Sequence, residues 1–370
     1  MSVSRASLAL FLIIFVACFI VLIPTGSLHE VYKTYFQSSP VSERPNAIIL
    51  MLIPPSRLQQ ATLALLNVEN RFNRRLKYPY ALFMSKDELA TVSDDVKAKI
   101  SWITEGRAEF VALTEESWEI PEFYDQTLID TSLLDISFSK GYCQMCRFYS
   151  GFFWRNPAVT KYEWLWRLDT EIEFHCDIPY DPVQRVIDTN ALYGFVQIAP
   201  DADWVQPTLA SNVSAFLQSH SDLLHSHSSH PNMGFTWRGK EGIENAMSGI
   251  AGNDDWTRMC MYNNFEISHR SIWESKLYTT FFEYLDRAGG FFYERWGDAP
   301  VHSFGLAMSL RKDQIMQFSD MGYQHQGWGY ECPAHLDRCT CVKEGVAANF
   351  NDNAEAWFNA TDYDTLILNL

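Results

Sequence analysis

The chain has 370 residues, of which 47% are hydrophobic and 20% charged, a balance typical of a folded globular protein rather than a disordered one. Its formal net charge of −16 at pH 7 argues against nucleic acid as a partner, because a phosphate backbone requires a basic face. A phosphate-bearing substrate would therefore need a divalent cation, or a local group of Arg and Lys side chains, to hold it.

The N-terminal segment predicts a membrane anchor. Residues 6–28 carry no charged side chain, and residues 8–26 approach the ~20 residues that span a bilayer. A cleaved signal peptide is the alternative, but no small-x-small cleavage site closely follows the apolar run. Arg5 predicts that residues 1–7 are cytoplasmic, which places the rest of the chain in the lumen.

After a polar stem at residues 27–45, the pattern predicts an α/β domain over residues 46–370. Residues 47–53 form a continuous apolar run, typical of a buried parallel strand. Apolar side chains at helical spacing follow over residues 58–72, and residues 80–84 supply the next strand. Strand, helix and strand at this spacing predict a βαβ unit.

The rest of the chain continues this alternation without an internal repeat or a clear domain boundary. Further strands are predicted at residues 109–113, 164–168, 192–198 and 314–318. Helices are predicted at residues 144–154 and 272–285, the second ending at the glycines that follow it.

Asp169 and Glu171 follow an apolar strand directly. Alternate side chains of extended backbone point the same way, so both carboxylates can approach one divalent cation. A solvated turn is the alternative interpretation of this pattern.

Residues 291–303 combine aromatic, acidic, basic and Gly/Pro residues in a pattern typical of sugar binding, in which rings cover C–H faces and carboxylates accept from hydroxyls. The alternative is a buried loop in which Asp298 caps a helix that begins near Ala299.

Two further candidates are ambiguous from the residues alone. Glu266 lies between bulky apolar residues, as in a half-buried strand or a cleft. His325 lies in a predicted loop, where it is either structural or a metal ligand. A His-rich segment at residues 220–230 is interpreted as a solvated loop.

The cysteines and sequons agree with a lumenal address. Seven of the eight cysteines fall after the anchor, so at least one is unpaired or joins another chain. Cys332, Cys339 and Cys341 are interpreted as staples of a loop-rich tail, with a zinc site as the weaker alternative. Asn212 and Asn359 are candidate glycosylation sites.

Taken together, these segments resemble the fungal α-1,2-mannosyltransferases of glycosyltransferase family 15, which are type II membrane proteins of the secretory pathway. The resemblance covers residues 45–341 and is most specific in GGFFYERWGDAPVHS at residues 289–303, CRFYSGFFW at 146–154, YEWLWR at 162–167 and NFEI at 264–267. It implies a single GT-A-like α/β domain with a mixed, mostly parallel central sheet, on a transmembrane anchor in the Golgi membrane.

The resemblance also implies the site. It implies Mn²⁺ and the donor GDP-mannose, with Glu266 as the candidate acidic nucleophile and Tyr142 at the reacting hydroxyl of the acceptor. The metal ligands fall on His325, Asp169 and Glu171. Substrate contacts fall on residues of the matching segments: Arg147, Trp166, Arg167, Glu294, Arg295, Trp296 and Asp298.

Two departures from the family pattern bear on activity. Its Glu-Pro-Asp motif is Asp169-Thr170-Glu171 here, which shortens the first carboxylate arm by one methylene and removes the proline that restricts the backbone. Its Arg-Asn after the first strand is Pro54-Pro55 here, with Arg57 as a possible substitute.

The expected function is therefore retaining transfer of mannose to a mannose-terminated N- or O-linked glycan. Glu266 would act through two displacements or by stabilising positive charge during same-face attack. The alternative is an inactive family member that binds lumenal glycans or partners other Golgi transferases.

Overall fold

The computed structural model describes residues 44–135, 139–224, 232–327, 338–341 and 357. From residue 45 onward, the described residues belong to one compact unit. The predicted cytoplasmic tail and anchor lie outside the described residues. None of the helices that the structure does describe is long and apolar enough to cross a membrane.

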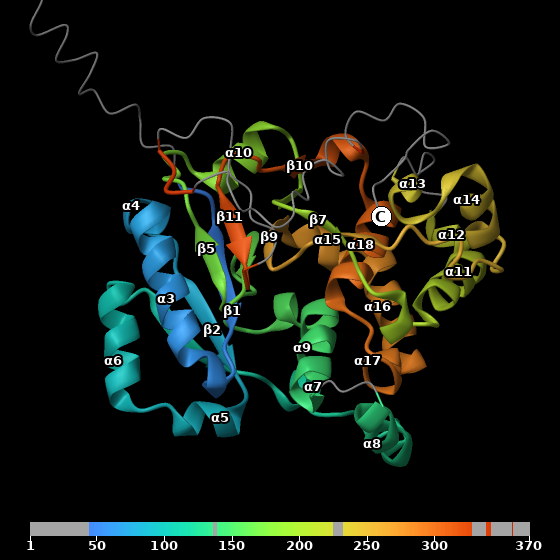
Figure 1. Ribbon diagram of the computed structural model, residues 1–370, viewed down its shortest axis with the longest axis horizontal. Helices are drawn as coiled ribbons and strands as arrows, with labels where there is room; N and C mark the ends of the chain where they lie inside the picture. Colours follow the sequence, from blue (N-terminus) through green and yellow to red (C-terminus); the bar gives the residue numbers. More distant parts are fainter. Residues whose placement is uncertain (1–43, 136–138, 225–231, 328–337, 342–356, 358–370) are drawn as a thin grey trace, which may run out of the picture. The chain divides into compact units, whose positions relative to one another are not determined.

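A seven-stranded sheet with the order β10-β6-β9-β4-β1-β2-β3 forms the centre of the described domain (Figure 1). Four of the six neighbouring pairs are parallel, and β9 runs antiparallel to both of its neighbours. The predicted mixed, mostly parallel sheet is confirmed. Its strands are β1 (Ala47–Leu52), β2 (Tyr80–Met84), β3 (Ala108–Ala112), β4 (Trp164–Leu168), β6 (Tyr193–Phe195), β9 (Phe265–His269) and β10 (Ile315–Gln317).

Both faces of this sheet are buried, which explains the unbroken apolar run of its first strand. Ile48 and Leu50 of β1 point into the core on one face, whereas Ile49 and Met51 point into the core on the other. A strand between two cores needs apolar side chains at every position, because successive side chains point to opposite faces.

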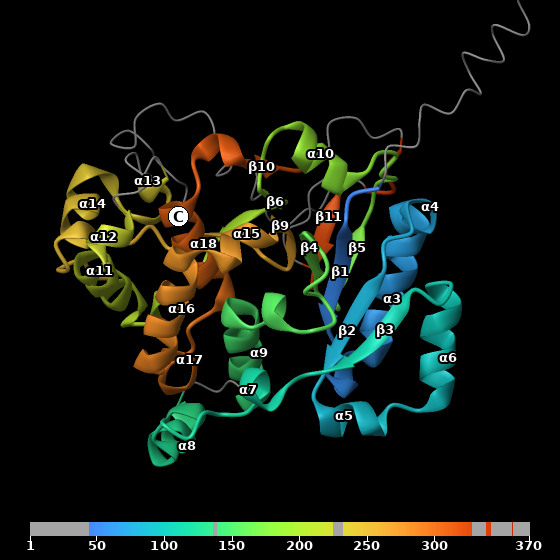
Figure 2. The ribbon, with the colours of Figure 1, turned by 180° about the vertical axis from the view of Figure 1, so that it is seen from behind.

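Different helices cover the two faces (Figures 1 and 2). The side chains of α3 (Leu58–Val68) and α6 (Asp94–Ile103) belong to one core, together with α4 (Arg74–Leu76) and α5 (Lys86–Thr91) at its margin. The other core takes side chains from α9 (Lys140–Gly151), α15 (Arg270–Glu274), α16 (Lys276–Ala288), α17 (Gly290–Tyr293) and α18 (Asp298–Ser309).

The remaining elements are short or peripheral. The helices are α7 (Glu115–Trp118), α8 (Gln126–Asp135), α10 (Pro182–Asp188), α11 (Leu209–Ser219), α12 (Ser221–Leu224), α13 (Met233–Thr236) and α14 (Gly239–Met247). Two small antiparallel sheets pair β5 (Ile172–Phe174) with β11 (Tyr323–His325), and β7 (Ile198–Pro200) with β8 (Met259–Met261).

Several predicted boundaries shift for local reasons. The helix predicted over residues 272–285 is two helices, divided at Ser275, whose Oγ accepts from the backbone N–H of Tyr278 at 3.1 Å and caps α16. The end of α16 at Gly289, with φ of 81°, is as predicted. The strand predicted over residues 192–198 is divided into β6 and β7, which join different sheets.

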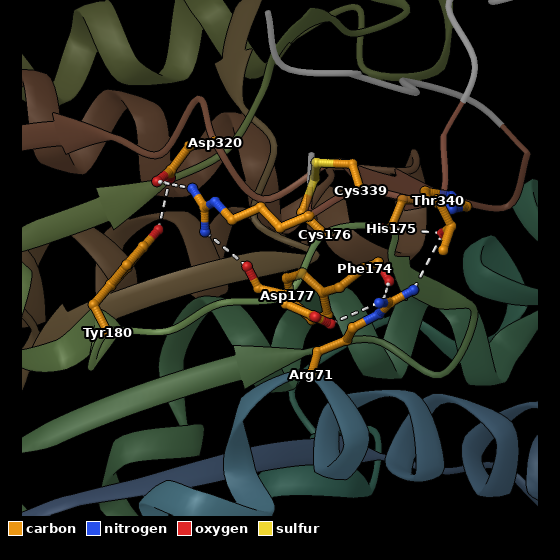
Figure 3. The surroundings of a disulfide bond; sticks show 10 residues. Arg71, Phe174, His175, Cys176, Asp177, Tyr180, Asp320, Cys339 and Thr340 are labelled. Carbon is orange, nitrogen blue, oxygen red and sulfur yellow. Dashed lines mark hydrogen bonds and ion pairs between the residues drawn. A yellow bond between two sulfur atoms is a disulfide. The ribbon is translucent and has the colours of Figure 1, made fainter. Parts of the chain in front are cut away.

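A disulfide between Cys176 and Cys339 joins the C-terminal segment to the chain just after β5 (Figure 3). Arg71 reinforces the junction, donating to the Phe174 carbonyl at 2.9 Å, to Asp177 at 2.8 Å and to Thr340 Oγ1 at 3.1 Å. Cys339 therefore staples the tail, as predicted, and its partner Cys176 lies just after β5, the strand that pairs with β11.

The cysteine sulfurs do not form a zinc site. Among the described residues, the sulfurs of Cys176, Cys339 and Cys341 lie within 4.8 Å of one another, but all three cysteines are in disulfides and supply no thiolate. Cys143, Cys146 and Cys260 are free and buried.

Candidate active site

A cavity of about 760 Å³ opens at the carboxyl ends of β1 and β4. From β1 the chain continues through β2 to β3 on one side, and β4 then lies on the other side of β1. The connections leave these two neighbouring strands in opposite directions, which creates the crevice where open α/β sheets bind ligands. Residues 52–57 and residues 167–171 form two of its walls.

Two predicted metal ligands meet in this cavity. Asp169 follows β4, and His325 ends β11, so it lies on a strand rather than in the predicted loop. His325 Nε2 lies 3.7 Å from Asp169 Oδ2. This separation is too long for a hydrogen bond, but it fits two ligands that each lie about 2.1 Å from one shared cation.

The protonation state of His325 also suits a ligand. Burial lowers the pKa of His325 below its ordinary value of 6.5, which keeps the imidazole neutral at pH 7. Its Nδ1 lies 3.5 Å from the Tyr262 hydroxyl, on the side of the ring away from the nitrogen that faces Asp169. A carboxylate oxygen and a neutral imidazole nitrogen are ligands that divalent transition ions accept together.

The third predicted ligand, Glu171, is oriented differently. Its carboxylate forms an ion pair with Arg57 and accepts from Gln326 Nε2 at 2.8 Å. Arg57 lines the cavity beyond β1, a few residues after Pro54-Pro55, which replace the family's Arg-Asn. The structure thus brings Asp169 and His325 together, and places Glu171 beside them against a basic side chain.

An ion-pair chain forms the floor of the cavity. The Arg167 guanidinium binds Asp298, donates to Asp169 Oδ1 at 3.2 Å and lies 3.5 Å from the centre of the Tyr149 ring. Burial alone would raise the pKa of Asp298, but the Arg167 charge lowers it below its usual value. Asp298 is therefore ionised, and it lies in the first turn of α18, after an N-cap at Gly297. Asp298 does not cap α18 with its side chain, as the alternative interpretation held, because Arg167 binds its carboxylate.

The opposite wall contains the predicted acceptor residue. The Tyr142 hydroxyl accepts from Arg295 Nη1 at 3.1 Å, and Arg295 Nη2 donates to Asp201 Oδ1 at 3.1 Å. The neighbouring Cys146 sulfur and burial raise the pKa of Tyr142, so its phenol stays protonated at neutral pH. All of Tyr142, Arg295 and Asp201 line the cavity.

Glu266 lies behind this cavity and does not line it. It belongs to β9, has no exposed surface, and accepts from the Tyr193 hydroxyl at 2.9 Å. Its Oε2 also lies 2.9 Å from His302 Nδ1, whereas Oε1 has no hydrogen-bond partner among the described residues. The first four residues of β9 are buried, so the strand around Glu266 is not half-buried as one alternative held.

Four predicted substrate contacts also lie away from the cavity. Trp166 and Trp296 are fully buried in the two cores, and Trp166 stacks on Phe72 with ring centres 4.8 Å apart. Arg147 makes two bonds to Asp286, at 2.7 and 3.0 Å. Glu294 accepts from Thr208 and from the Trp296 indole. The resemblance assigned these four to substrate, whereas their contacts support the fold around the site.

Other cavity residues were not predicted from the sequence. Asp201, Tyr149 and Asn263 face the cavity from an irregular segment, a helix and the turn before β9. Asn263 Nδ2 donates to Asp298 at 3.0 Å, and the position of Asn263 beside the NFEI motif is a signal that could have found it. Asp201 has no such signal, because its position depends on contacts between distant segments, such as its pairing with Arg295.

The remaining candidates are the two glycosylation sites and the His-rich segment. Asn212 lies on α11, and its side chain donates to the Thr208 carbonyl at 2.8 Å. His220 follows the same helix and stacks on Phe216, so it belongs to a packed helix end and not to a solvated loop. Asn359 and residues 225–231 lie outside the described residues.

Known proteins resemble the chain over most of its length. A sequence profile of the family described as glycolipid 2-alpha-mannosyltransferase matches residues 26–360. The O-glycoside alpha-1,2-mannosyltransferase homolog 3 of Schizosaccharomyces pombe is 35% identical over 84% of this chain and 80% of its own. The alpha-1,2 mannosyltransferase KTR1 of Saccharomyces cerevisiae is 32% identical over 80% of this chain and 74% of its own.

A solved structure agrees with this relationship. Core-mannan synthase A from Aspergillus fumigatus, in a Mn/GDP form, superposes with a TM-score of 0.71 at 30% identity, over 84% of this chain and 82% of its own. The shared α/β glycosyltransferase fold, the cavity at the end of its sheet and the match over residues 26–360 lead to one conclusion. The chain belongs to the glycolipid 2-alpha-mannosyltransferase family.

Proposed function

We propose that this protein is a Mn²⁺-dependent α-1,2-mannosyltransferase that moves mannose, with retention, from GDP-mannose to the 2-hydroxyl of a mannose-terminated glycan. The pair formed by Asp169 and His325 at the mouth of the cavity carries this proposal, together with family membership. The remaining charged residues of the cavity divide between a donor half and an acceptor half.

On the donor half, Asp169 and His325 would hold the metal ion, which when bound supplies positive charge to the diphosphate. Arg57 adds a fixed cation at the end of β1, on the same side of the cavity. In this acidic chain, the metal ion, when bound, and Arg57 would supply the positive charge that a diphosphate needs.

On the acceptor half, Tyr142 positions the reacting hydroxyl. Its raised pKa keeps the phenol protonated, so its hydroxyl donates a hydrogen bond and does not act as a base. Arg295 fixes the phenol from one side, and the ionised Asp298 accepts from sugar hydroxyls on the other. Two charged groups and a phenol can orient a hydroxyl that is otherwise free to rotate.

Glu266 acts, in this proposal, as a charge stabiliser and not as a nucleophile. Because it has no exposed surface and does not line the cavity, its carboxylate cannot reach a sugar carbon without displacing the residues in front of it. Its negative charge lies behind Arg167 and Tyr149, in a dry environment where electrostatic effects extend further than in water. Same-face attack is the route that uses such a charge.

The second candidate function is that of an inactive glycan-binding family member or a partner of other Golgi transferases. It is favoured by the ion pair between Glu171 and Arg57, because this pair engages a carboxylate that was predicted to bind the metal ion. One experiment separates the two: the full-length chain is incubated with GDP-mannose, Mn²⁺ and α-methyl mannoside, and the disaccharide product is measured. Transfer that is absent with a chelator and restored by Mn²⁺ supports the enzyme, whereas no transfer at saturating acceptor supports the binding module.

We further propose that residues 8–26 anchor the protein in the Golgi membrane with residues 46–370 in the lumen. The charge-free segment and the two sequons at Asn212 and Asn359 support this topology. A C-terminal tag should be protected from protease in sealed microsomes, and endoglycosidase treatment should reduce the mass of the wild type. A cytosolic tag would contradict the topology, and an Asn212→Gln, Asn359→Gln double variant supplies the unglycosylated control.

A further inference from the structure

A turn at the rim of the cavity presents a tryptophan to solvent. Trp204 is 71% exposed, on a 3-10 turn that spans Asp203–Val205. The segment before it, residues 199–201, lines the cavity. The turn therefore continues directly from the wall of the candidate active site.

Hydrogen bonds to residues of the site hold this turn rigidly. The Val205 carbonyl accepts from the Arg295 backbone N–H at 2.7 Å, and Asp201 pairs with the Arg295 guanidinium. Gln206 donates to Asp201 Oδ2 at 3.0 Å and accepts from the Gly297 N–H at 3.3 Å. An exposed aromatic ring on a fixed backbone loses little conformational entropy when it binds a ligand.

The turn that carries Trp204 also carries a charged pair. Asp203 lies 3.7 Å from Arg258, and their side chains are 41% and 31% exposed. Arg258 has a φ of 64°, an unfavourable value for a residue other than glycine, and its carbonyl accepts from the Asp201 N–H at 2.9 Å. The strained backbone of Arg258 thus connects the cavity wall, through Asp201, to the ion-pair partner of Asp203, the residue before the exposed indole.

We propose that Trp204, Asp203 and Arg258 form a second glycan subsite, which binds a mannose unit of the acceptor further from the unit that receives the new sugar. The indole would cover the C–H face of a pyranose, while the carboxylate and guanidinium bind neighbouring hydroxyls. The subsite would select oligomannose acceptors over single sugars. This inference rests on the proposed function, because it extends the acceptor side of that reaction.

Trp102 supplies a matched control, since isolated exposed apolar side chains are common on protein surfaces. It is 78% exposed on α6 and does not line the cavity. In the full-length chain, Trp204→Ala should raise KM for a linear mannotetraose by about tenfold, and leave KM for α-methyl mannoside and for GDP-mannose unchanged. Trp204→Tyr should retain most of the preference, Asp203→Asn should lose part of it, and Trp102→Ala should match the wild type.

An unchanged KM for mannotetraose in a folded Trp204→Ala protein would overturn the subsite. An equal rise for both acceptors would also overturn it, because the ring would then serve the reacting sugar. If the wild type transfers no mannose, the proposed function fails, and calorimetric titration with mannotetraose tests the subsite separately. Binding by Trp102→Ala but not by Trp204→Ala supports the subsite, whereas equal binding or no binding by both rejects it.

Discussion

Oε2 of Glu266 lies 2.9 Å from Nδ1 of His302, and both side chains are fully buried. His302 Nε2 lies 2.8 Å from the Tyr149 carbonyl, which can only accept, so Nε2 carries a hydrogen. The Tyr193 hydroxyl donates to the same Oε2. These contacts fix the Glu266 carboxylate, to which the proposed mechanism assigns the stabilising charge, behind the cavity.

The first prediction concerns that charge. Glu266→Gln keeps the shape of the side chain but removes its charge, so kcat should fall by about 10²–10⁴, or roughly 2.7–5.5 kcal/mol of transition-state stabilisation. GDP-mannose affinity should stay near that of the wild type, because the charge acts mainly once the glycosidic bond begins to break. Turnover, donor affinity and melting temperature of the one variant are the measurements.

Glu69 provides the control for this prediction. It is also buried, binds Arg107 at 2.6 Å and Tyr80 at 2.5 Å, and does not line the cavity. Glu69→Gln should lower the melting temperature and leave kcat per folded molecule nearly unchanged. Near-normal turnover in a folded Glu266→Gln protein would remove Glu266 from the mechanism.

The second prediction concerns the metal. His325→Ala should weaken GDP binding at least tenfold in the presence of Mn²⁺ and hardly alter it in metal-free buffer, because the lost imidazole acts only through the ion. Glu171→Gln should have the smaller effect, since its carboxylate is held by Arg57 and Gln326. Equal losses with and without Mn²⁺ for His325→Ala would show that His325 is structural.

The third prediction tests Arg57 as a diphosphate contact. Its side chain is 42% exposed, so solvent screens its charge, and Arg57→Ala should raise the Kd for GDP in Mn²⁺ by only about threefold to tenfold. The effect should shrink as salt concentration rises. Arg311 is a matched control, because it pairs with Asp313 on the surface and does not line the cavity. A larger loss for Arg311→Ala than for Arg57→Ala would reject the assignment.

The fourth prediction concerns the effect of the disulfide on the predicted metal ligands Asp169 and His325. Gly322, just before β11, has no room for a side chain: an added Cβ would lie 2.7 Å from the Cys176 sulfur. The disulfide thus packs against the residue that immediately precedes the strand carrying His325. Cys176→Ser should cost about 2–5 kcal/mol of stability and weaken Mn²⁺-dependent GDP binding.

Cys339→Ser and the double variant should show the same losses, because one bond is removed in all three. Chemical denaturation and GDP titration measure the two effects. Double-variant losses equal to the sum of the single-variant losses would contradict this account.

The sequence alone determined the framework of this protein. The strands β1, β2 and β4 and the βαβ unit could be predicted because a strand buried on both faces needs apolar side chains at every position. The end of α16 at Gly289 could also be predicted, because a left-handed residue favours glycine. Family motifs identified Asp169, His325, Tyr142 and Arg295 as site candidates, and all four line the cavity.

Only the tertiary structure decided which of the motif residues face the cavity. Glu266 and Trp166 lie in motifs as specific as that of Asp169, yet they are buried, because a motif does not show whether a side chain faces the core or the crevice. Asp201 and Arg258 have no local sequence signal, since their positions depend on pairing with Arg295 and Asp203 across irregular segments. Long-range pairings of this kind leave no periodic pattern in the chain, and they are the physical reason that the composition of this site required the folded structure.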